Sequence, residues 1–120
     1  PIETTHKVLF TEKHLEKFAK ANSKYSECVV GMMRYAINRY REHYNINGYP
    51  IHDACAVAVA VDEKIISEEK TVFGTVDLNF GYSRGRTIFD MNNRLKKNKN
   101  ISIVTDVYAN KVMDLLYNSI

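Results

Sequence analysis

The chain has 120 residues, of which 45% are hydrophobic and 26% are charged, and its formal net charge is +3. These proportions are ordinary for a globular protein and argue against disorder, collagen-like repeats and disulfide scaffolds. No apolar stretch approaches the roughly 18 residues that a membrane-spanning helix needs, so no membrane partner is expected. The length suits one domain or part of one.

Two helices are predicted in the first part of the chain. A short strand-like run over residues 6–10 precedes an amphipathic helix over residues 12–20. From residue 25 onward, apolar side chains recur at three- and four-residue steps, which predicts a longer helix that ends near Tyr44. The predicted apolar sides hold Leu15, Phe18 and Ala19 in the first helix, and Tyr25, Cys28, Val29, Met32, Ala36 and Tyr40 in the second.

Residues 54–61 form a run without a polar side chain, directly after a turn-rich loop at residues 45–50 and the pair His52-Asp53. Such a run is expected to be buried on all sides. Its alternation of Val and Ala suits a strand, whereas its alanine content, with Asp53 as an N-cap, suits a buried helix equally well. Periodicity alone does not decide between the two.

The last part of the chain predicts strands followed by a helix. Residues 70–80 alternate as a strand does, and residues 86–91 return after a Gly-rich turn, so the two form a predicted β-hairpin. A further strand is expected over residues 101–104, and Asp106 can cap a final helix. The predicted apolar face of that helix holds Tyr108, Val112, Leu115 and Leu116. Helices and strands are therefore mixed, which predicts an α/β or α+β chain whose elements need packing partners.

Charge and cysteine usage narrow the class of protein further. The basic run at residues 94–99 could hold phosphates, but it is a single run between two strand-like segments and has no interleaved aromatic residues. A solvated loop is therefore the favoured interpretation, and no nucleic-acid partner is expected. Cys28 and Cys55 lie in apolar patterns and are interpreted as reduced core residues of a cytoplasmic protein.

His52-Asp53 is the one candidate for chemistry, since the chain has no phosphate-binding glycine loop, Cys-x-x-Cys pair, nucleophile elbow or zinc-binding helix motif. An imidazole at the mouth of a buried element suits general acid or base work. A carboxylate at a helix N-terminus gains roughly 0.3–1 kcal/mol from the helix dipole and is a good ligand for a hard cation. On spacing alone, however, Asp53 is favoured as a plain N-cap and His52 as a structural histidine.

Four segments, in order, carry a resemblance to a known family. They are PIETTHKVLFT (residues 1–11), YPIHDACAVA (residues 49–58), RGRTIFD (residues 84–90) and NISIVTDV (residues 100–107). Together they resemble the C-terminal portion of the inosine-uridine preferring nucleoside hydrolases. The resemblance implies the C-terminal part of that family's α/β fold, an open mixed sheet with flanking helices.

The resemblance also implies an activity, which is hydrolysis of the N-glycosidic bond of ribonucleosides to ribose and free base, with bound Ca²⁺. By motif position, His52 is the proton donor to the leaving base, and Asp53 is a Ca²⁺ ligand that also contacts substrate. Tyr40 and Tyr44 match aromatic residues that line the base pocket, although core packing is equally expected for Tyr40. His6 and Asp106 match positions interpreted as structural, and a cytoplasmic homodimer or homotetramer is implied.

One departure from the family pattern is large. The aspartate-rich first signature and the Asn-containing ribose-binding segments are absent from residues 1–120. Because Ca²⁺ takes about six to eight oxygen ligands, a segment with Asp53 alone is expected neither to hold the metal nor to turn over substrate. We therefore expect residues 1–120 to be the C-terminal segment of a single domain whose N-terminal part lies outside this chain. The alternative is a non-catalytic relative that binds nucleosides or a protein partner.

Overall fold

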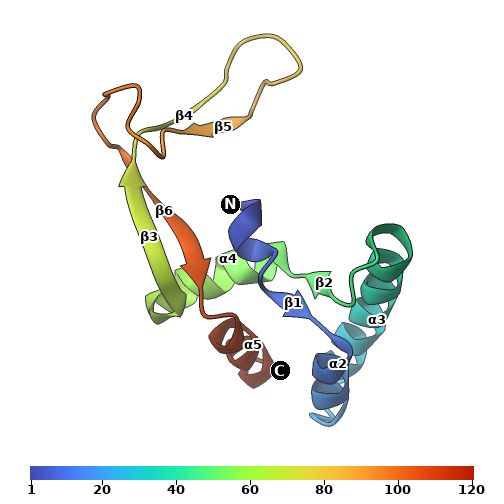
Figure 1. Cartoon of the computed structure of the whole chain (residues 1–120). Helices are drawn as coiled ribbons and strands as arrows, with labels where there is room; N and C mark the ends of the chain where they lie inside the picture. The colour runs from blue at the N-terminus through green and yellow to red at the C-terminus, as the bar shows by residue number, and fades with distance from the viewer.

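The computed structural model describes residues 1–120 and confirms a mixed α/β architecture (Figure 1). The helices are α1 (Ile2–Thr5), α2 (Glu12–Ala19), α3 (Lys24–Tyr44), α4 (His52–Val61), the 3-10 turn η1 (Glu63–Ile65) and α5 (Ala109–Asn118). The strands are β1 (Leu9–Phe10), β2 (Tyr49–Pro50), β3 (Ile66–Val72), β4 (Gly74–Val76), β5 (Thr87–Phe89) and β6 (Ile101–Val107). Within this chain the strands form three antiparallel pairs, β1 with β2, β3 with β6, and β4 with β5.

The N-terminal segment begins as a helical turn, and the strand predicted over residues 6–10 is reduced to the two residues of β1. The backbone amides of Thr5 and His6 donate to the carbonyls of Pro1 and Ile2, at 3.2 and 2.9 Å, which closes the turn of α1. Val8 is fully buried and Phe10 nearly so, whereas Leu9 between them is less buried, an alternation typical of a strand. Only the last two positions find a partner strand, because β2 is itself two residues long.

Helices α2 and α3 pack against each other and occupy the predicted parts of the chain. Ser23 and Ser26 exchange backbone-to-hydroxyl hydrogen bonds of 3.0 Å at the start of α3, and Asn45 ends it in the left-handed region, at φ 56°. The predicted apolar face of α3 is correct only in part, since Val29 and Tyr40 are partly buried. The inward stripe holds Ser26, Val30, Met33, Ile37 and Tyr40, whereas Tyr25, Cys28 and Met32 are exposed.

The apolar run after His52-Asp53 is a helix, α4, and it is not buried on all sides as expected. Cys55 and Ala58 face the core, whereas Val57 and Val61 are 63% and 67% exposed. α4 has neighbours in α1, η1 and α5, and these cover one side of it. The apolar composition predicted that α4 packs against other elements on every side. Within this chain, only the face that holds Cys55 and Ala58 is packed in this way.

The predicted strand over residues 70–80 is divided. β3 pairs with β6 as far as Val72, and after Phe73 the chain changes partner and β4 pairs with β5. This second pair confirms the predicted hairpin, but in three residues per strand. Beyond it, Leu78 and Phe80 are 78% and 98% exposed, so the alternation there does not mark a buried face.

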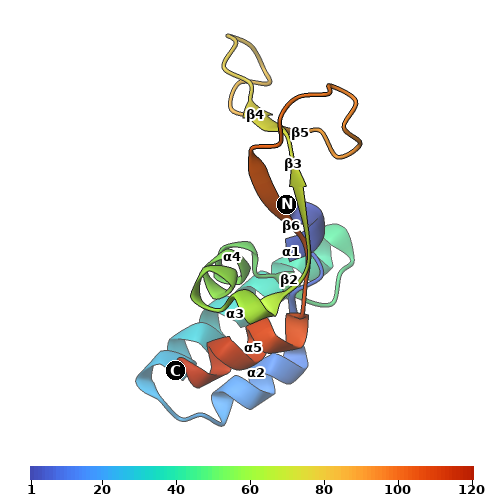
Figure 2. The same cartoon turned by 90° about the vertical axis from the view of Figure 1, so that its left-hand side faces the viewer.

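The overall shape is elongated. The radius of gyration is 17.2 Å, compared with roughly 14 Å for a compact chain of this length. Helices α2 to α5 gather at one end around a core of thirteen residues, while β4, β5 and the basic loop project from the other end (Figures 1 and 2). Residues 94–99 are exposed, as predicted. None of the helices combines the length and the hydrophobicity that a membrane span requires.

Candidate functional site

His52 is the first residue of α4, and its position depends on a segment that lies far away in sequence. The β1–β2 pair brings residues 49–50 beside residues 9–10, and the Ile51 amide donates to the Val8 carbonyl at 3.2 Å. The start of α4 is thereby placed next to α1. The Thr5 hydroxyl lies 2.6 Å from Nδ1 of His52, which is a short hydrogen bond.

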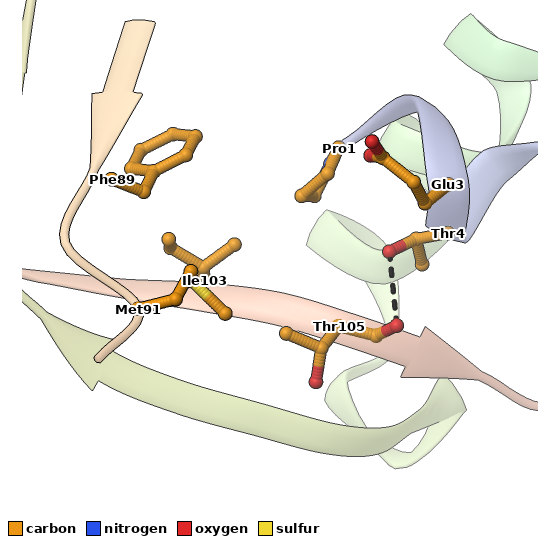
Figure 3. A pocket seen from close by; sticks show the side chains of 7 residues that line it. All are labelled: Pro1, Glu3, Thr4, Phe89, Met91, Ile103 and Thr105. Atoms are coloured by element: carbon orange, nitrogen blue, oxygen red, sulfur yellow. Dashed lines mark hydrogen bonds between the residues drawn. The ribbon is translucent and has the colours of Figure 1, made fainter.

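The α1 turn that carries Thr5 is itself anchored to β6. The Thr4 hydroxyl donates to the carbonyls of Val104 and Thr105, both at 3.1 Å, and Thr4 is 3% exposed. Figure 3 shows the bond to Thr105. A buried hydroxyl with two acceptors is costly to displace, so α1 has a fixed position relative to the sheet. Since Thr5 follows Thr4, this anchor also fixes the hydrogen-bond partner of His52.

His6 completes the surroundings of the His52 ring. The two ring centroids lie 5.2 Å apart with an interplanar angle of 40°. Three consecutive residues thus have three separate contacts: Thr4 with β6, Thr5 with Nδ1 of His52, and His6 with the His52 ring. This leaves Nε2 as the ring nitrogen of His52 without a hydrogen-bond partner in the chain.

Asp53 lies beside His52 at the rim of a shallow hollow of about 260 Å³. It is the second residue of α4 and not the N-cap, because the Ile51 carbonyl already accepts the Cys55 amide at 2.9 Å. Its carboxylate is exposed and joins none of the chain's ion pairs. The hollow is lined by Met33, Tyr49, Ile51, His52, Asp53 and Ala54.

The two tyrosines predicted to contact a base do not line this hollow. Tyr40 is half-buried between Tyr44 and Tyr49, with ring centroids 4.8 and 5.0 Å away. Tyr44 is 64% exposed at the end of α3. Tyr49, which does line the hollow, therefore connects it to Tyr40 through ring contacts.

The set of metal ligands in this chain is small. No group of three His, Cys, Asp or Glu side chains is close enough together to hold an ion. The exposed, unpaired carboxylate of Asp53, in the first turn of α4, has the hard-oxygen chemistry that suits Ca²⁺. It fits as one ligand of a set of about six to eight, and this chain does not supply the others.

A second cleft lies between α1 and the residues of β5 and β6 that face it (Figure 3). It has a volume of about 340 Å³ and separates the N-terminal turn from Phe89, Met91 and Ile103, whose side chains make its far wall. Glu3 is its one charged side chain. It shares no lining residue with the hollow at His52, and its apolar wall provides no pair of groups for acid–base chemistry.

Comparison with known proteins places the chain in a family. The sequence profile of the inosine-uridine preferring nucleoside hydrolases matches residues 1–114, and the chain belongs to that family, as its motifs predict. It is 29% identical to a "Probable ribonucleoside hydrolase" of Dictyostelium discoideum, an alignment that covers 100% of this chain and 37% of that protein.

The fold is that of solved nucleoside hydrolases. A plant nucleoside hydrolase superposes with a TM-score of 0.79 at 24% identity, covering 98% of this chain and 38% of that one. A purine-preferring ribonucleoside hydrolase from Gardnerella vaginalis gives 0.78 at 26% identity, with the same coverage. The chain thus spans well under half of the length of the proteins it resembles.

Sequence reasoning missed Thr5, Tyr49 and Met33 as neighbours of the His52-Asp53 pair. Thr5 lies within a segment that carried the family resemblance, but its partner is 47 positions away, and no local pattern indicates such a contact. Tyr49 precedes the motif by three residues, and its closeness in sequence was the available signal. Met33 reaches the hollow because it lies on the inward stripe of α3, one residue from the predicted face.

Proposed function

We propose that the protein containing this chain hydrolyses the N-glycosidic bond of ribonucleosides, and that residues 1–120 form the C-terminal segment of its catalytic domain. The observation that carries the proposal is the contact of His52 with Thr5 at the rim of the hollow, in a chain of the nucleoside hydrolase family. Nδ1 of His52 is hydrogen-bonded to Thr5, and Nε2 has no partner in this chain. A ring that gives a proton to a ligand needs one nitrogen available in this way.

His52 acts in this proposal as the proton donor to the departing base. When the glycosidic bond breaks, the base takes the bonding electron pair, and a proton from Nε2 neutralises the charge that develops on it. The ribosyl carbon, which is oxocarbenium-like in the transition state, is captured by water, whose proton passes to a carboxylate in the part of the protein outside this chain. General acid assistance of this kind is worth roughly 10²–10⁴-fold in rate.

Asp53 supplies one ligand to Ca²⁺ in this proposal, together with carboxylates from the part of the protein outside this chain. Bound Ca²⁺ would orient and acidify the attacking water and hold ribose hydroxyls. The exposed carboxylate next to His52 would also place the ribose beside the proton donor. Tyr44 and Tyr40 are proposed to contact the base once the site is complete. The Tyr40 ring lies against the rings of Tyr44 and Tyr49, and Tyr49 lines the hollow.

The cellular context belongs to the same proposal. The two free thiols suit a reducing compartment, so we place the protein in the cytoplasm, and homodimers or homotetramers are proposed from the family resemblance. The segment alone is proposed to be inactive, because it carries one of the required metal ligands.

The test uses the complete protein and two kinds of substrate. His52→Ala is expected to lower hydrolysis of inosine or uridine about 10²-fold or more, measured by release of reducing sugar. A p-nitrophenyl riboside should be cleaved at close to the wild-type rate, because its leaving group departs as a stable anion and needs no proton. His43→Ala, an exposed histidine on α3, is the matched control. Equal rates for His52→Ala and wild type on inosine would disprove the donor role.

Metal dependence has its own test. Removal of Ca²⁺ with a chelator should abolish activity and lower the thermal midpoint, and Asp53→Asn should raise the Ca²⁺ concentration needed for half-maximal activity. Calorimetry distinguishes the alternative, a non-catalytic relative. Nucleoside binding with no base released over prolonged incubation would favour that alternative over the enzyme.

A further inference from the structure

We propose that Thr5 is a positioning residue, which keeps a proton on Nδ1 of His52 and so makes Nε2 the atom that gives its proton to the leaving group. The inference rests on the proposed function, because it specifies how the His52 donor is held. It comes from the juxtaposition of the last residue of α1 with the first residue of α4, joined at 2.6 Å.

A hydroxyl can either donate to or accept from an imidazole nitrogen, so the direction of this bond depends on the rest of the hydroxyl's surroundings. The Thr5 hydroxyl has two further acceptors, the carbonyls of Ile2 at 3.3 Å and Pro1 at 3.4 Å. Its own proton can therefore point into α1 while its oxygen accepts from Nδ1–H. In this arrangement hydrogen bonds run in series from Nδ1–H of His52 to the Thr5 hydroxyl, and from that hydroxyl to a backbone carbonyl of α1.

The Thr5 oxygen is held rigidly. Threonine is β-branched, so few χ1 rotamers are open to it, and the preceding residue, Thr4, is buried and bonded twice to β6. The His6 ring lies beside the His52 ring, with the two centroids 5.2 Å apart. A rotation of the His52 ring that exchanged its two nitrogens would break the hydrogen bond to Thr5. No other side chain in this chain is hydrogen-bonded to the ring.

The proton balance favours this direction of the bond. In the transfer, Nε2 carries the proton that is given away, and Nδ1–H donates to the Thr5 oxygen. In the reaction the Nε2–H bond breaks, the same proton forms an N–H bond on the base, and the base takes the electron pair of the glycosidic bond. The neutral ring that remains still has its proton on Nδ1. The Thr5 bond is thus present before and after the transfer, so no hydrogen bond must reorganise during the step.

The experiment uses the complete protein with ¹⁵N-labelled histidine and the variants Thr5→Val and Thr5→Ser. In the wild type the His52 nitrogen shifts should report protonated Nδ1 in the neutral ring. Thr5→Val should remove that signature and lower kcat for inosine roughly tenfold, as the loss of one short hydrogen bond allows, while KM stays within about twofold. Thr5→Ser, which keeps the hydroxyl, should restore both. Thr71→Val, at an exposed position of β3, is the control for the same replacement.

The outcomes separate this inference from the proposed function. If Thr5→Val is folded by circular dichroism and keeps both the Nδ1 signature and the wild-type kcat, the positioning role is overturned, although His52 can still be the donor. If His52→Ala itself leaves inosine hydrolysis unchanged, the donor role and the positioning role both fail. Loss of the signature and of kcat in Thr5→Val, with the p-nitrophenyl riboside cleaved normally, supports the proposal.

Discussion

Lys7 and Asp106 join the two ends of the chain, since Lys7 Nζ donates to Asp106 Oδ1 across 2.8 Å and 99 positions of sequence. Asp106 was expected to cap the last helix. It lies instead within β6, and α5 begins after Tyr108. The hydrogen bond from Lys7 holds the pKa of the Asp106 carboxyl below its usual value of 3.8. Together with Thr4, this ion pair ties the segment that carries Thr5 to the sheet.

The Lys7–Asp106 pair predicts an acid-sensitive contribution to stability. A carboxyl whose pKa is lowered by folding stabilises the folded state above the unfolded pKa, and this contribution is lost as the pH falls through the lower folded value. Asp106→Asn should therefore weaken stability at neutral pH and have less effect well below pH 3.8. Urea midpoints measured across this range check the prediction, with Glu16→Gln, an exposed residue of α2, as control. A deficit independent of pH would contradict it.

His14 predicts a second pH effect, at higher pH. Burial and the nearby Lys17 lower the pKa of His14 from its usual 6.5, against an opposing influence of Asp114. The neutral ring accepts the Thr11 amide on Nδ1 at 2.9 Å, at the start of α2. Stability should thus be complete above pH 6.5 and fall as the pH drops through the lower folded pKa. His14→Gln should flatten this part of the curve, whereas an unchanged slope would exclude His14 as its source.

The buried Thr4 hydroxyl predicts a larger, pH-independent effect. Thr4→Val keeps the shape of the side chain but leaves the carbonyls of Val104 and Thr105 without their donor. An unsatisfied buried group costs about 1–3 kcal/mol, so the free energy of unfolding should fall by about that amount. Thr71→Val, which is exposed on β3, should change it little. Equal effects of the two replacements would show that the Thr4 bonds do not stabilise the fold.

Local features of the sequence were sufficient to predict several elements. Leu15 and Phe18 are buried on α2 as predicted, because neighbouring positions on one helix face decide that burial. α3 ends at Tyr44, as predicted, with Asn45 as its C-cap, because turn chemistry acts within a few residues. The His52-Asp53 pair begins a helix, which was one of the two structures considered for the apolar run that follows it. The family motif around the pair was recognised from the sequence alone.

The incorrect predictions have non-local causes. The strand over residues 70–80 divides where its partner changes from β6 to β5, and no property of the strand itself marks that exchange. The face of α3 depends on where α2 lies. Likewise, the hydrogen bond between Thr5 and His52 exists because β1 pairs with β2, so the candidate residues could be predicted from sequence but their arrangement could not.

The corrected face of α3 can be tested by truncation. Ile37 is fully buried and Met32 is 54% exposed, although the predicted apolar face included Met32 and not Ile37. Ile37→Ala should lower the free energy of unfolding by about 2–5 kcal/mol, and Met32→Ala should change it by about 0.5 kcal/mol or less. Urea unfolding of both variants checks the prediction, and the reverse order would restore the face predicted from periodicity.

The two cysteines should differ in reactivity for the same geometric reason. Cys28 was predicted to be a core residue, but it lies two positions after Ser26, about 200° around the helix from the inward stripe, and it is exposed. Cys55 is buried on α4, and burial raises the pKa of its thiol. Because the thiolate is the reactive form, a soluble thiol reagent should modify Cys28 quickly and Cys55 only at the rate of unfolding.

Single replacements show which cysteine gives the fast phase and which the slow phase of the thiol modification. Cys28→Ser should remove the fast phase and leave the slow one, and Cys55→Ser should do the opposite. Denaturant should merge the phases in the wild type, since both thiols are then equally accessible. A fast phase that survives in Cys28→Ser would mean that α4 separates readily from α1 and the core. Such opening would also expose the Thr5–His52 contact, so the rate of Cys55 modification measures how firmly the proposed proton donor is held.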